Sequence, residues 1–211
     1  MRQSTLIKLA VGLLAIAVFG VLFIRSVRNV GAQPYTLRRA TLAGWTVALD
    51  PAPATSGVRL ALWPPGTFAA PLFSQLFTRS GLSLSGPNPV SMPLLLESEF
   101  TRSVNGAVAP DALVQLARES GLESLQPTPQ CMASRRVSEP GVTREVYFLR
   151  FGDAAFTAFR QALAARVGAG GFEPAALSPV VIIAATDANF GSWLPLQGEP
   201  TQDCLAPLEL Q

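Results

Sequence analysis

Residues 131–151, CMASRRVSEPGVTREVYFLRF, carry the pattern that decides the fold. The runs 132–137 and 142–151 flank the turn sequence SEPG at 138–141, and the second run is rich in β-branched and aromatic residues. Such runs, separated by a short turn that contains Gly and Pro, are typical of a β-hairpin. We therefore expect two paired strands joined at residues 138–141.

The sequence after the hairpin predicts a helix and then a buried strand. Apolar residues recur at helical spacing over 154–167, and Gly168 follows the last of them. The continuous apolar run VVIIAAT at 180–186 is short enough for a buried strand in the centre of a sheet. This strand–strand–helix–strand order predicts an α+β domain, with helices packed on a mixed or antiparallel sheet.

Upstream of the hairpin, prolines divide the chain into short elements. All 18 prolines lie at or after Pro34, and proline stops helices and is excluded from central strands. From hydrophobic spacing and Gly or Pro boundaries we expect strands at 45–49 and 58–63 and helices at 67–78, 91–104 and 109–120.

The N-terminal segment contains a long apolar run. Residues 9–24, LAVGLLAIAVFGVLFI, are uncharged, and Leu6, Ile7 and Lys8, whose ammonium can reach the headgroups, extend the run to nineteen positions. At about 1.5 Å per residue, a helix of this length spans about 28 Å, close to the hydrocarbon thickness of a bilayer. The run predicts a single-pass anchor at 6–25, after a tail at 1–5 and before a juxtamembrane linker at 26–36 and a domain at 37–211. Its apolar side chains include Leu9, Leu13, Ile16, Phe19 and Phe23.

Two alternatives to the anchor stay open, a cleaved secretory signal and a buried helix of a soluble protein. The small residues at 30–32 resemble a signal cleavage site, but they lie well beyond Ile24. Arg25 and Arg28 also occupy the stretch that is neutral in a typical signal peptide. These features favour an uncleaved anchor.

The two cysteines, Cys131 and Cys204, indicate the compartment. A disulfide between them would tie the C-terminal tail to the domain, and such bonds persist in oxidising compartments. Two unpaired, buried thiols are the alternative. The positive-inside rule, taken literally, places the domain in the cytoplasm, although long domains translocate largely regardless of flanking charge. We expect the disulfide, and a periplasmic domain held at the inner membrane of a bacterium.

The charge of the domain excludes a basic nucleic-acid footprint. Residues 1–32 hold four basic residues and no acidic ones, whereas residues 33–211 hold 12 arginines and 14 acidic residues, a net charge of −2. Nucleic-acid-binding domains typically carry a clustered excess of positive charge. We expect no nucleic-acid partner.

The residue types exclude the commonest kinds of catalytic site. The chain has no histidine, so it cannot form a Ser-His-Asp triad, a Cys-His pair, a haem site with an axial histidine or an imidazole zinc site. Two cysteines cannot supply four thiolates. We expect no catalytic residues, metal site or cofactor.

One segment has side chains suited to a ligand or partner. Asp187, Asn189, Phe190 and Trp193 follow the predicted strand at 180–186, and strand ends in α/β sheets often carry sites. The alternative is an Asx-type turn that closes the strand over a packed Trp193. The hairpin arginines, Arg135, Arg136, Arg144 and Arg150, lie near Glu139 and Glu145, and cross-strand pairing explains them without a ligand.

These observations predict a non-enzymatic, membrane-anchored accessory or scaffolding subunit of a larger bacterial membrane complex of respiratory, photosynthetic or secretion type. Its partners would be integral membrane subunits in a hetero-oligomer, with the bilayer and bound lipids or pigments along the anchor helix. The alternative is an anchored envelope domain that binds a ligand or performs carboxylate-dependent hydrolysis. Hydrolysis of glycosides needs only two carboxylates, and Asp187 would be one of them.

Overall fold

The computed structural model describes residues 12–14, 16–22, 33–124, 127–152, 154–168, 171–196 and 204–211. Contacts divide the chain into two compact units, Met1–Gln33 and Pro34–Gln211. In the first unit, residues 12–14 and 16–22 are helical, and Leu13, Ile16 and Phe19 are exposed. The described residues include no helix with the length and apolar character needed to cross a bilayer. Leu9 and Phe23 lie outside the described residues, and the anchor at 6–25 stays a prediction.

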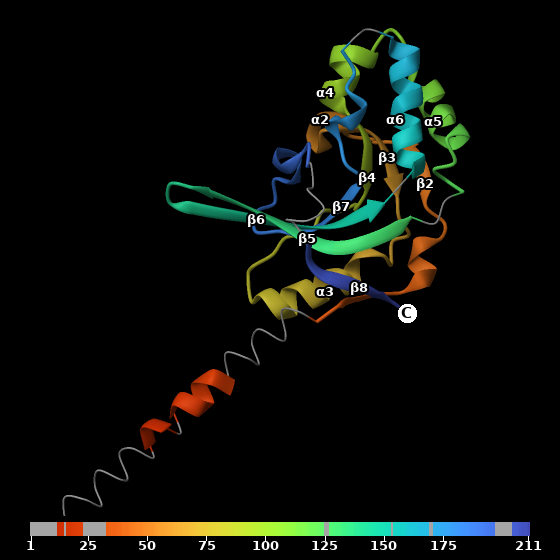
Figure 1. Cartoon of the computed structure of the whole chain (residues 1–211). Helices are drawn as coiled ribbons and strands as arrows, with labels where there is room; N and C mark the ends of the chain where they lie inside the picture. The colour runs from red at the N-terminus through yellow and green to blue at the C-terminus, as the bar shows by residue number, and fades with distance from the viewer. Residues whose placement is uncertain are drawn as a thin grey trace, which may run out of the picture. The chain divides into compact units, whose positions relative to one another are not determined.

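The second unit contains two β-sheets with helices packed against them, so the α+β class is confirmed (Figure 1). The five-stranded sheet has the order β1 (Tyr35–Leu37), β8 (Cys204–Leu210), β5 (Thr128–Glu139), β6 (Val142–Gly152) and β7 (Val180–Ala185). β1 pairs with β8 in parallel, and the other neighbours are antiparallel. The antiparallel three-stranded sheet contains β2 (Thr46–Leu49), β3 (Val58–Trp63) and β4 (Met92–Leu96).

The helices lie on either side of this framework. α4, α5 and α6 gather at the end of the domain that holds the three-stranded sheet (Figure 1), and α3 contacts β1 and β7. The helical elements are η1 (Arg39–Leu42), α2 (Pro53–Ser56), α3 (Ala69–Ser80), α4 (Glu97–Glu99), η2 (Phe100–Val104), α5 (Pro110–Glu119), α6 (Ala154–Val167), η3 (Pro174–Ala176) and η4 (Phe190–Trp193). The helices predicted at 67–78, 109–120 and 154–167 are confirmed as α3, α5 and α6.

The hairpin predicted from residues 131–151 is confirmed as β5 and β6, which pair from Glu139 and Val142 back to Thr128 and Gly152. Successive side chains of a strand point to opposite faces of the sheet. The larger core contains Tyr147, Leu149 and Phe151, together with Trp45, whose ring contacts Phe68 and Phe151 edge to face. A smaller cluster on the other face contains Cys131, Val146, Phe148 and Trp193.

The apolar strand at 180–186 is present as β7, but its predicted central position is wrong. β7 is the last strand of the five-stranded sheet and pairs only with β6 among the named strands. All six of its side chains are nevertheless buried. Val181 and Ile183 pack in the larger core, and Val180 and Ile182 in the smaller cluster. An apolar run therefore reports burial on both faces, whatever the number of neighbouring strands.

The helix predicted at 91–104 is also wrong in its first half, where the chain forms β4. Pairing with β3 buries all five residues of the run MPLLL, and a residue that precedes proline, here Met92, favours extended backbone. The helical segment begins only after Leu96, whose backbone N–H donates to Oε2 of Glu99 at 2.9 Å.

Both ends of the second unit form strands that the sequence did not predict. The C-terminal tail, for which the sequence analysis predicts no helix or strand, forms β8 between β1 and β5. β1 begins in the stretch expected to be linker at 26–36, and Gln75 of α3 holds it by accepting from Thr36 N and donating to Thr36 O, each at 2.9 Å. These pairings connect residues far apart in the sequence, which short-range periodicity does not report.

Candidate functional site

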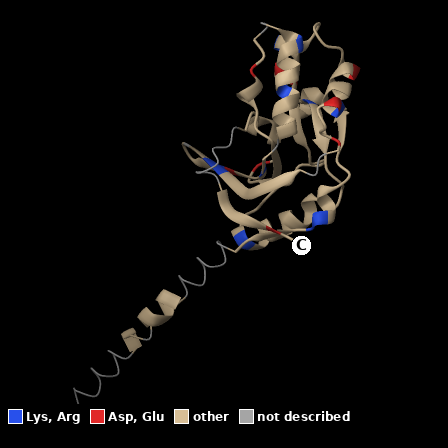
Figure 2. Cartoon of the chain, turned by 45° about the vertical axis from the view of Figure 1, so that its right-hand side comes forward, with Lys and Arg blue, Asp and Glu red and all other residues tan. Residues whose placement is uncertain are grey.

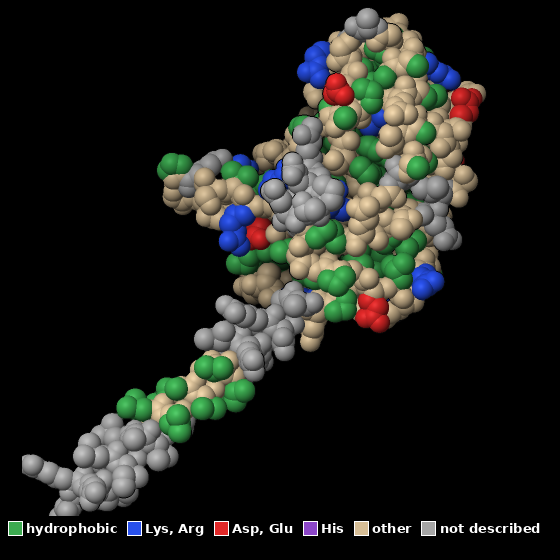
Figure 3. All heavy atoms as spheres, viewed as in Figure 1, with side chains coloured by type: hydrophobic (Ala, Val, Ile, Leu, Met, Phe, Trp, Pro, Cys, Tyr) green, Lys and Arg blue, Asp and Glu red, His purple; other side chains and the backbone are tan. Residues whose placement is uncertain are grey.

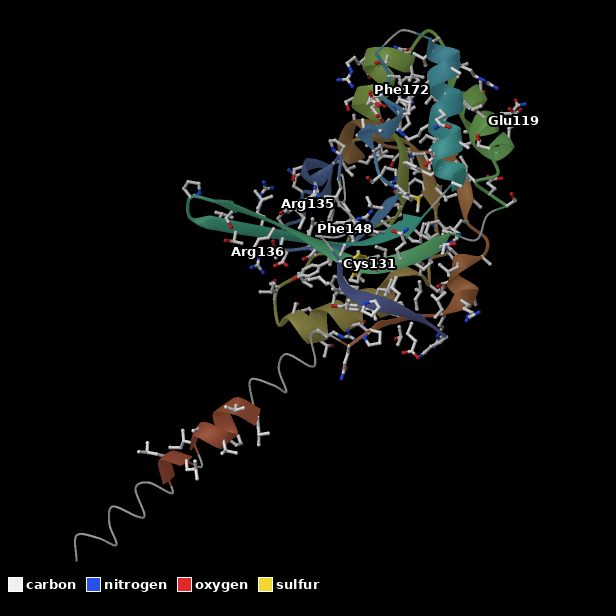
Figure 4. All side chains as sticks on the ribbon, viewed as in Figure 1. Glu119, Cys131, Arg135, Arg136, Phe148 and Phe172 are labelled. Atoms are coloured by element: carbon white, nitrogen blue, oxygen red, sulfur yellow. A yellow bond between two sulfur atoms is a disulfide. The ribbon has the colours of Figure 1, made fainter. Side chains whose placement is uncertain are left out.

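The disulfide expected between Cys131 and Cys204 is present. It joins β5 to the first residue of β8, and the two Cα atoms lie 5.8 Å apart. Cys131 is buried in the smaller cluster, near the centre of the sheet, as Figure 4 shows. A bond of this kind is consistent with an extracytoplasmic location.

The segment after β7 forms an Asx turn, which the sequence analysis gave as the alternative to a ligand surface. Oδ1 of Asp187 accepts from Asn189 N at 2.9 Å, which is the geometry of an Asx turn. Phe190 and Trp193 belong to the short helix η4, and Trp193 is buried with 6% of its surface exposed. This part of the predicted surface therefore covers the smaller cluster.

Arg144 reaches from β6 to this turn. Its guanidinium lies 5.2 Å from the centre of the Trp193 ring and 3.9 Å from Oδ2 of Asp187. It also donates to Oγ of Ser192 at 3.3 Å. Arg144 thus connects β6 to both Asp187 and the short helix η4.

The β5–β6 hairpin extends beyond the strands that flank it. β8 pairs with β5 only over residues 131–133, and β7 pairs with β6 only from Val146 onward. Residues 134–144, here called the arm, project from the body of the domain in Figures 1 and 3. Among the described residues, no strand flanks the arm on either side.

The arm carries arginines and a cross-strand ion pair. Arg135 and Arg136 lie on its β5 side (Figure 4), and Nη2 of Arg136 is 2.8 Å from Oε2 of Glu145, directly opposite on β6. The hydrogen bond and charge of Glu145 raise the pKa of the Arg136 guanidinium. The predicted cross-strand pairing is present for this pair, whereas Arg150 is buried with no hydrogen-bond partner for its Nη1. Figure 2 shows acidic and basic side chains interspersed over the helices and the arm.

Along the β5 edge of the arm, backbone groups have no strand partner among the described residues. Along an antiparallel ladder, successive residues of a strand direct their backbone groups to opposite neighbours. The odd-numbered residues Glu145 and Phe151 bond towards β7. The backbone groups of the even-numbered residues of β6 therefore point towards β5. The residues of β5 that face away from β6 are then Ser134, Arg136 and Ser138. These residues present donors and acceptors to solvent along one edge.

Two cavities lie side by side along the edge of β7. The first, of about 460 Å³, is lined by Trp63, Phe73, Gly86, Val90 and Ile183, among others. The second, of about 440 Å³, is lined by residues that include Asp50, Ala52, Pro93, Val180, Ile182, Phe190 and Leu194. Trp63 and residues 87–89 line both cavities, and the Trp63 indole is held by donating to Ala48 O at 3.3 Å.

The cavities offer little for acid–base chemistry. Among the described residues that line them, Asp50 is the one ionisable side chain, and Asp187 is not part of either lining. A glycosidase-type reaction needs two carboxyl groups about 5–10 Å apart across the substrate. In the described part of the chain, no group of three or more acidic or Cys residues could hold a metal ion.

Sequence reasoning identified Asp187 and its neighbours but missed the cavities and the edge of β7. Of the predicted residues, Asn189 and Phe190 line the second cavity, whereas Asp187 and Trp193 do not. The spacing of Trp63, the Pro-rich segment 87–93 and β7 along the chain gave no sign that they come together. No family model, curated protein or solved structure matches this chain. The geometry of the site is therefore the sole basis for its role.

Proposed function

We propose that this protein is a non-enzymatic, membrane-anchored accessory subunit whose domain contacts its partners on the extracytoplasmic side of a bacterial inner membrane. The disulfide between Cys131 and Cys204 supports the oxidising side. The apolar run at 6–25 supplies the anchor in this proposal, and its length matches the bilayer.

The observation that carries the proposal is the arm. A two-stranded ribbon that no neighbouring strand covers is marginally stable on its own, and its open edge can pair with another chain. The described arm has three arginines, Arg135, Arg136 and Arg144, and Arg136 is paired with Glu145 at its base. Because Arg144 also lies beside Asp187, the partner surface that fits such an arm is a strand of another subunit that pairs with its open edge.

A shortened arm tests this role. Val137 and Arg144 face each other across the hairpin, so replacing residues 138–143 with Asn-Gly gives a two-residue turn that suits a hairpin. The full chain and the shortened variant would each be tagged and purified from detergent-solubilised native membranes. A full-length variant with Ser138→Ala is the matched control.

We expect the full chain and the Ser138→Ala variant to copurify with the same membrane proteins, and the shortened variant to lose them while its thermal stability is unchanged. Removal of residues 1–32 should release the domain from the membrane fraction. Retention of all partners by the shortened variant, or recovery of the full chain only as a monomer, would reject the proposal.

Ligand binding is the second candidate function, because two cavities of ligand size adjoin each other. The lack of a second carboxylate among the described lining residues favours a ligand that is bound and not hydrolysed.

A further inference from the structure

The free edge of β7 opens into the second cavity. Phe151 N donates to Pro179 O, and Thr186 N donates to Glu145 O, which fixes the hydrogen-bonded pairs between β6 and β7. Val180 and Ile182, which lie opposite Arg150 and Phe148, occupy the alternate positions. Their backbone N–H and C=O groups therefore point away from β6.

These backbone groups belong to buried residues and have no hydrogen-bond partner in the described part of the chain. Val180 is 1% exposed and Ile182 is 8% exposed, and both line the second cavity. Neither residue forms a backbone hydrogen bond on its outer side with any described residue. Because buried backbone donors and acceptors are almost always paired in folded proteins, this edge is built to receive a partner.

The chain itself shows that the edge accepts a strand. Ser85 pairs with Ala185 at the far end of β7, with both N–H···O distances 2.8 Å. The adjacent residue is Gly86, where a Cβ atom would lie 3.3 Å from the Phe73 ring and 3.4 Å from Ile183 O. A glycine lets the segment approach β7 closely at this point, and the pairing stops there. The positions of Ile182 and Val180 along the same edge are left open.

The lining of the cavity defines the chemistry of the occupant. Apolar side chains dominate it, including those of Trp63, Pro93, Phe190 and Leu194. Asp50 is the one charged side chain among the described lining residues, and its Oδ1 already accepts from Ala52 N at 2.7 Å. A matching occupant has donors and acceptors at strand spacing along one edge and uncharged, apolar side chains.

We propose that the second cavity binds an extended, apolar peptide segment of a partner protein, which pairs with Val180 and Ile182 by strand addition. Main-chain hydrogen bonds then supply affinity, and the pocket around the alternate side chains supplies specificity. The site is separate from the arm and does not depend on the proposed subunit role.

Two matched variants test the site. Ala52 and Ala54 are both exposed residues at α2, but only Ala52 lines the cavity. Ala52→Trp places a large ring at the cavity, whereas Ala54→Trp adds the same ring outside it. Ala188→Trp, at a second exposed lining position, serves if Ala52→Trp does not fold, as judged by circular dichroism and thermal melting.

The probe is a library of acetylated, amidated hexapeptides built from Val, Ile, Leu, Phe, Thr and Ser, passed over the full chain in detergent. We expect peptides that wild type and Ala54→Trp retain equally and that Ala52→Trp binds at least about tenfold more weakly. The best peptide, once N-methylated at the residues that donate to β7, should also bind wild type about tenfold more weakly, because two main-chain hydrogen bonds disappear.

Amide hydrogen exchange gives an independent readout. The N–H groups of Val180 and Ile182 should exchange more slowly when the peptide is bound. The proposal is overturned if no peptide is retained, since water then satisfies the edge. The proposal is also overturned if Ala52→Trp and Ala188→Trp retain the peptides as well as wild type does, or if the N-methylated peptide binds with full affinity.

Discussion

Nη2 of Arg160 on α6 lies 2.6 Å from Oε1 of Glu99 on α4, and both side chains are buried. The guanidinium also donates to three backbone carbonyls, those of Leu94, Glu173 and Pro174, at 3.1, 2.8 and 2.7 Å. The Phe172 ring, labelled in Figure 4, lies 4.7 Å from the guanidinium. This single side chain thus connects α6 to β4, to α4 and to the segment before η3.

Replacing Arg160 with Met should destabilise the domain by about 3–5 kcal/mol, because a buried Glu99 carboxylate is left without its counter-charge. Denaturant unfolding of the full chain measures the change. The double variant Arg160→Met, Glu99→Met should recover much of the loss. Arg166→Ala is the matched control, since Arg166 pairs with the exposed Glu119 at 3.5 Å and its loss should cost less than about 1 kcal/mol. Equal effects of the two single variants would contradict this role of Arg160.

Loss of the disulfide should lower the free energy of unfolding by about 2–5 kcal/mol, because it closes a long loop between residues separated by 73 positions. The double variant Cys131→Ser, Cys204→Ser should unfold at a lower denaturant concentration and show no response to dithiothreitol. Wild type should respond to the reductant by a shift of the same size. A wild-type protein indifferent to reductant would show that the bond does not form.

Alkaline pH should destabilise the domain through Tyr147. Burial, with a further contribution from the Glu145 carboxylate, raises the pKa of Tyr147 to about 12, whereas a tyrosine in an unfolded chain ionises near pH 10. The unfolded chain loses this proton first, so the stability that the group contributes is full below about pH 10 and is lost as the pH rises towards about 12. Unfolding measured at pH 9 and pH 11.5 should show a smaller decrease for Tyr147→Phe than for wild type.

Tyr35 provides the comparison for that experiment. Burial raises its pKa as well, although the Arg79 guanidinium opposes the shift. Tyr35 also makes one of the smaller contributions to the raised pKa of Tyr147, so the Tyr35→Phe variant should retain most of the decrease that belongs to Tyr147. If Tyr147→Phe and wild type lose equal stability between the two pH values, Tyr147 is not the group that titrates.

The Asx turn after β7 can be separated from the charge of Asp187. Asp187→Ala removes the acceptor for Asn189 N and should cost about 0.5–1.5 kcal/mol, whereas Asp187→Asn keeps an oxygen at that position and should cost less. Thermal melts of the two variants measure the difference. Asp187→Asn should also leave copurification with partners unchanged, and a loss of partners in this variant would point to a functional carboxylate.

The elements that the sequence predicted well are those with a strong local pattern. The β-branched and aromatic residues of 142–151 and the SEPG turn are enough to define the β5–β6 hairpin, and the spacing of Phe156, Phe159 and Leu163 is enough for α6. The candidate site was predicted only in part, because Asn189 and Phe190 reach the second cavity while Asp187 closes a turn.

By itself, the sequence determined that the domain is α+β, that it contains a hairpin at 131–151, that one disulfide is available and that histidine chemistry is absent. Tertiary structure decided that MPLLL pairs as β4, that β7 is an edge strand and that β8 enters the sheet beside β1. It also brought together Arg160 and Glu99, which lie 61 positions apart in the sequence. The physical reason is that periodicity records which side chains are buried, whereas the partners that bury them are selected by contacts between distant segments.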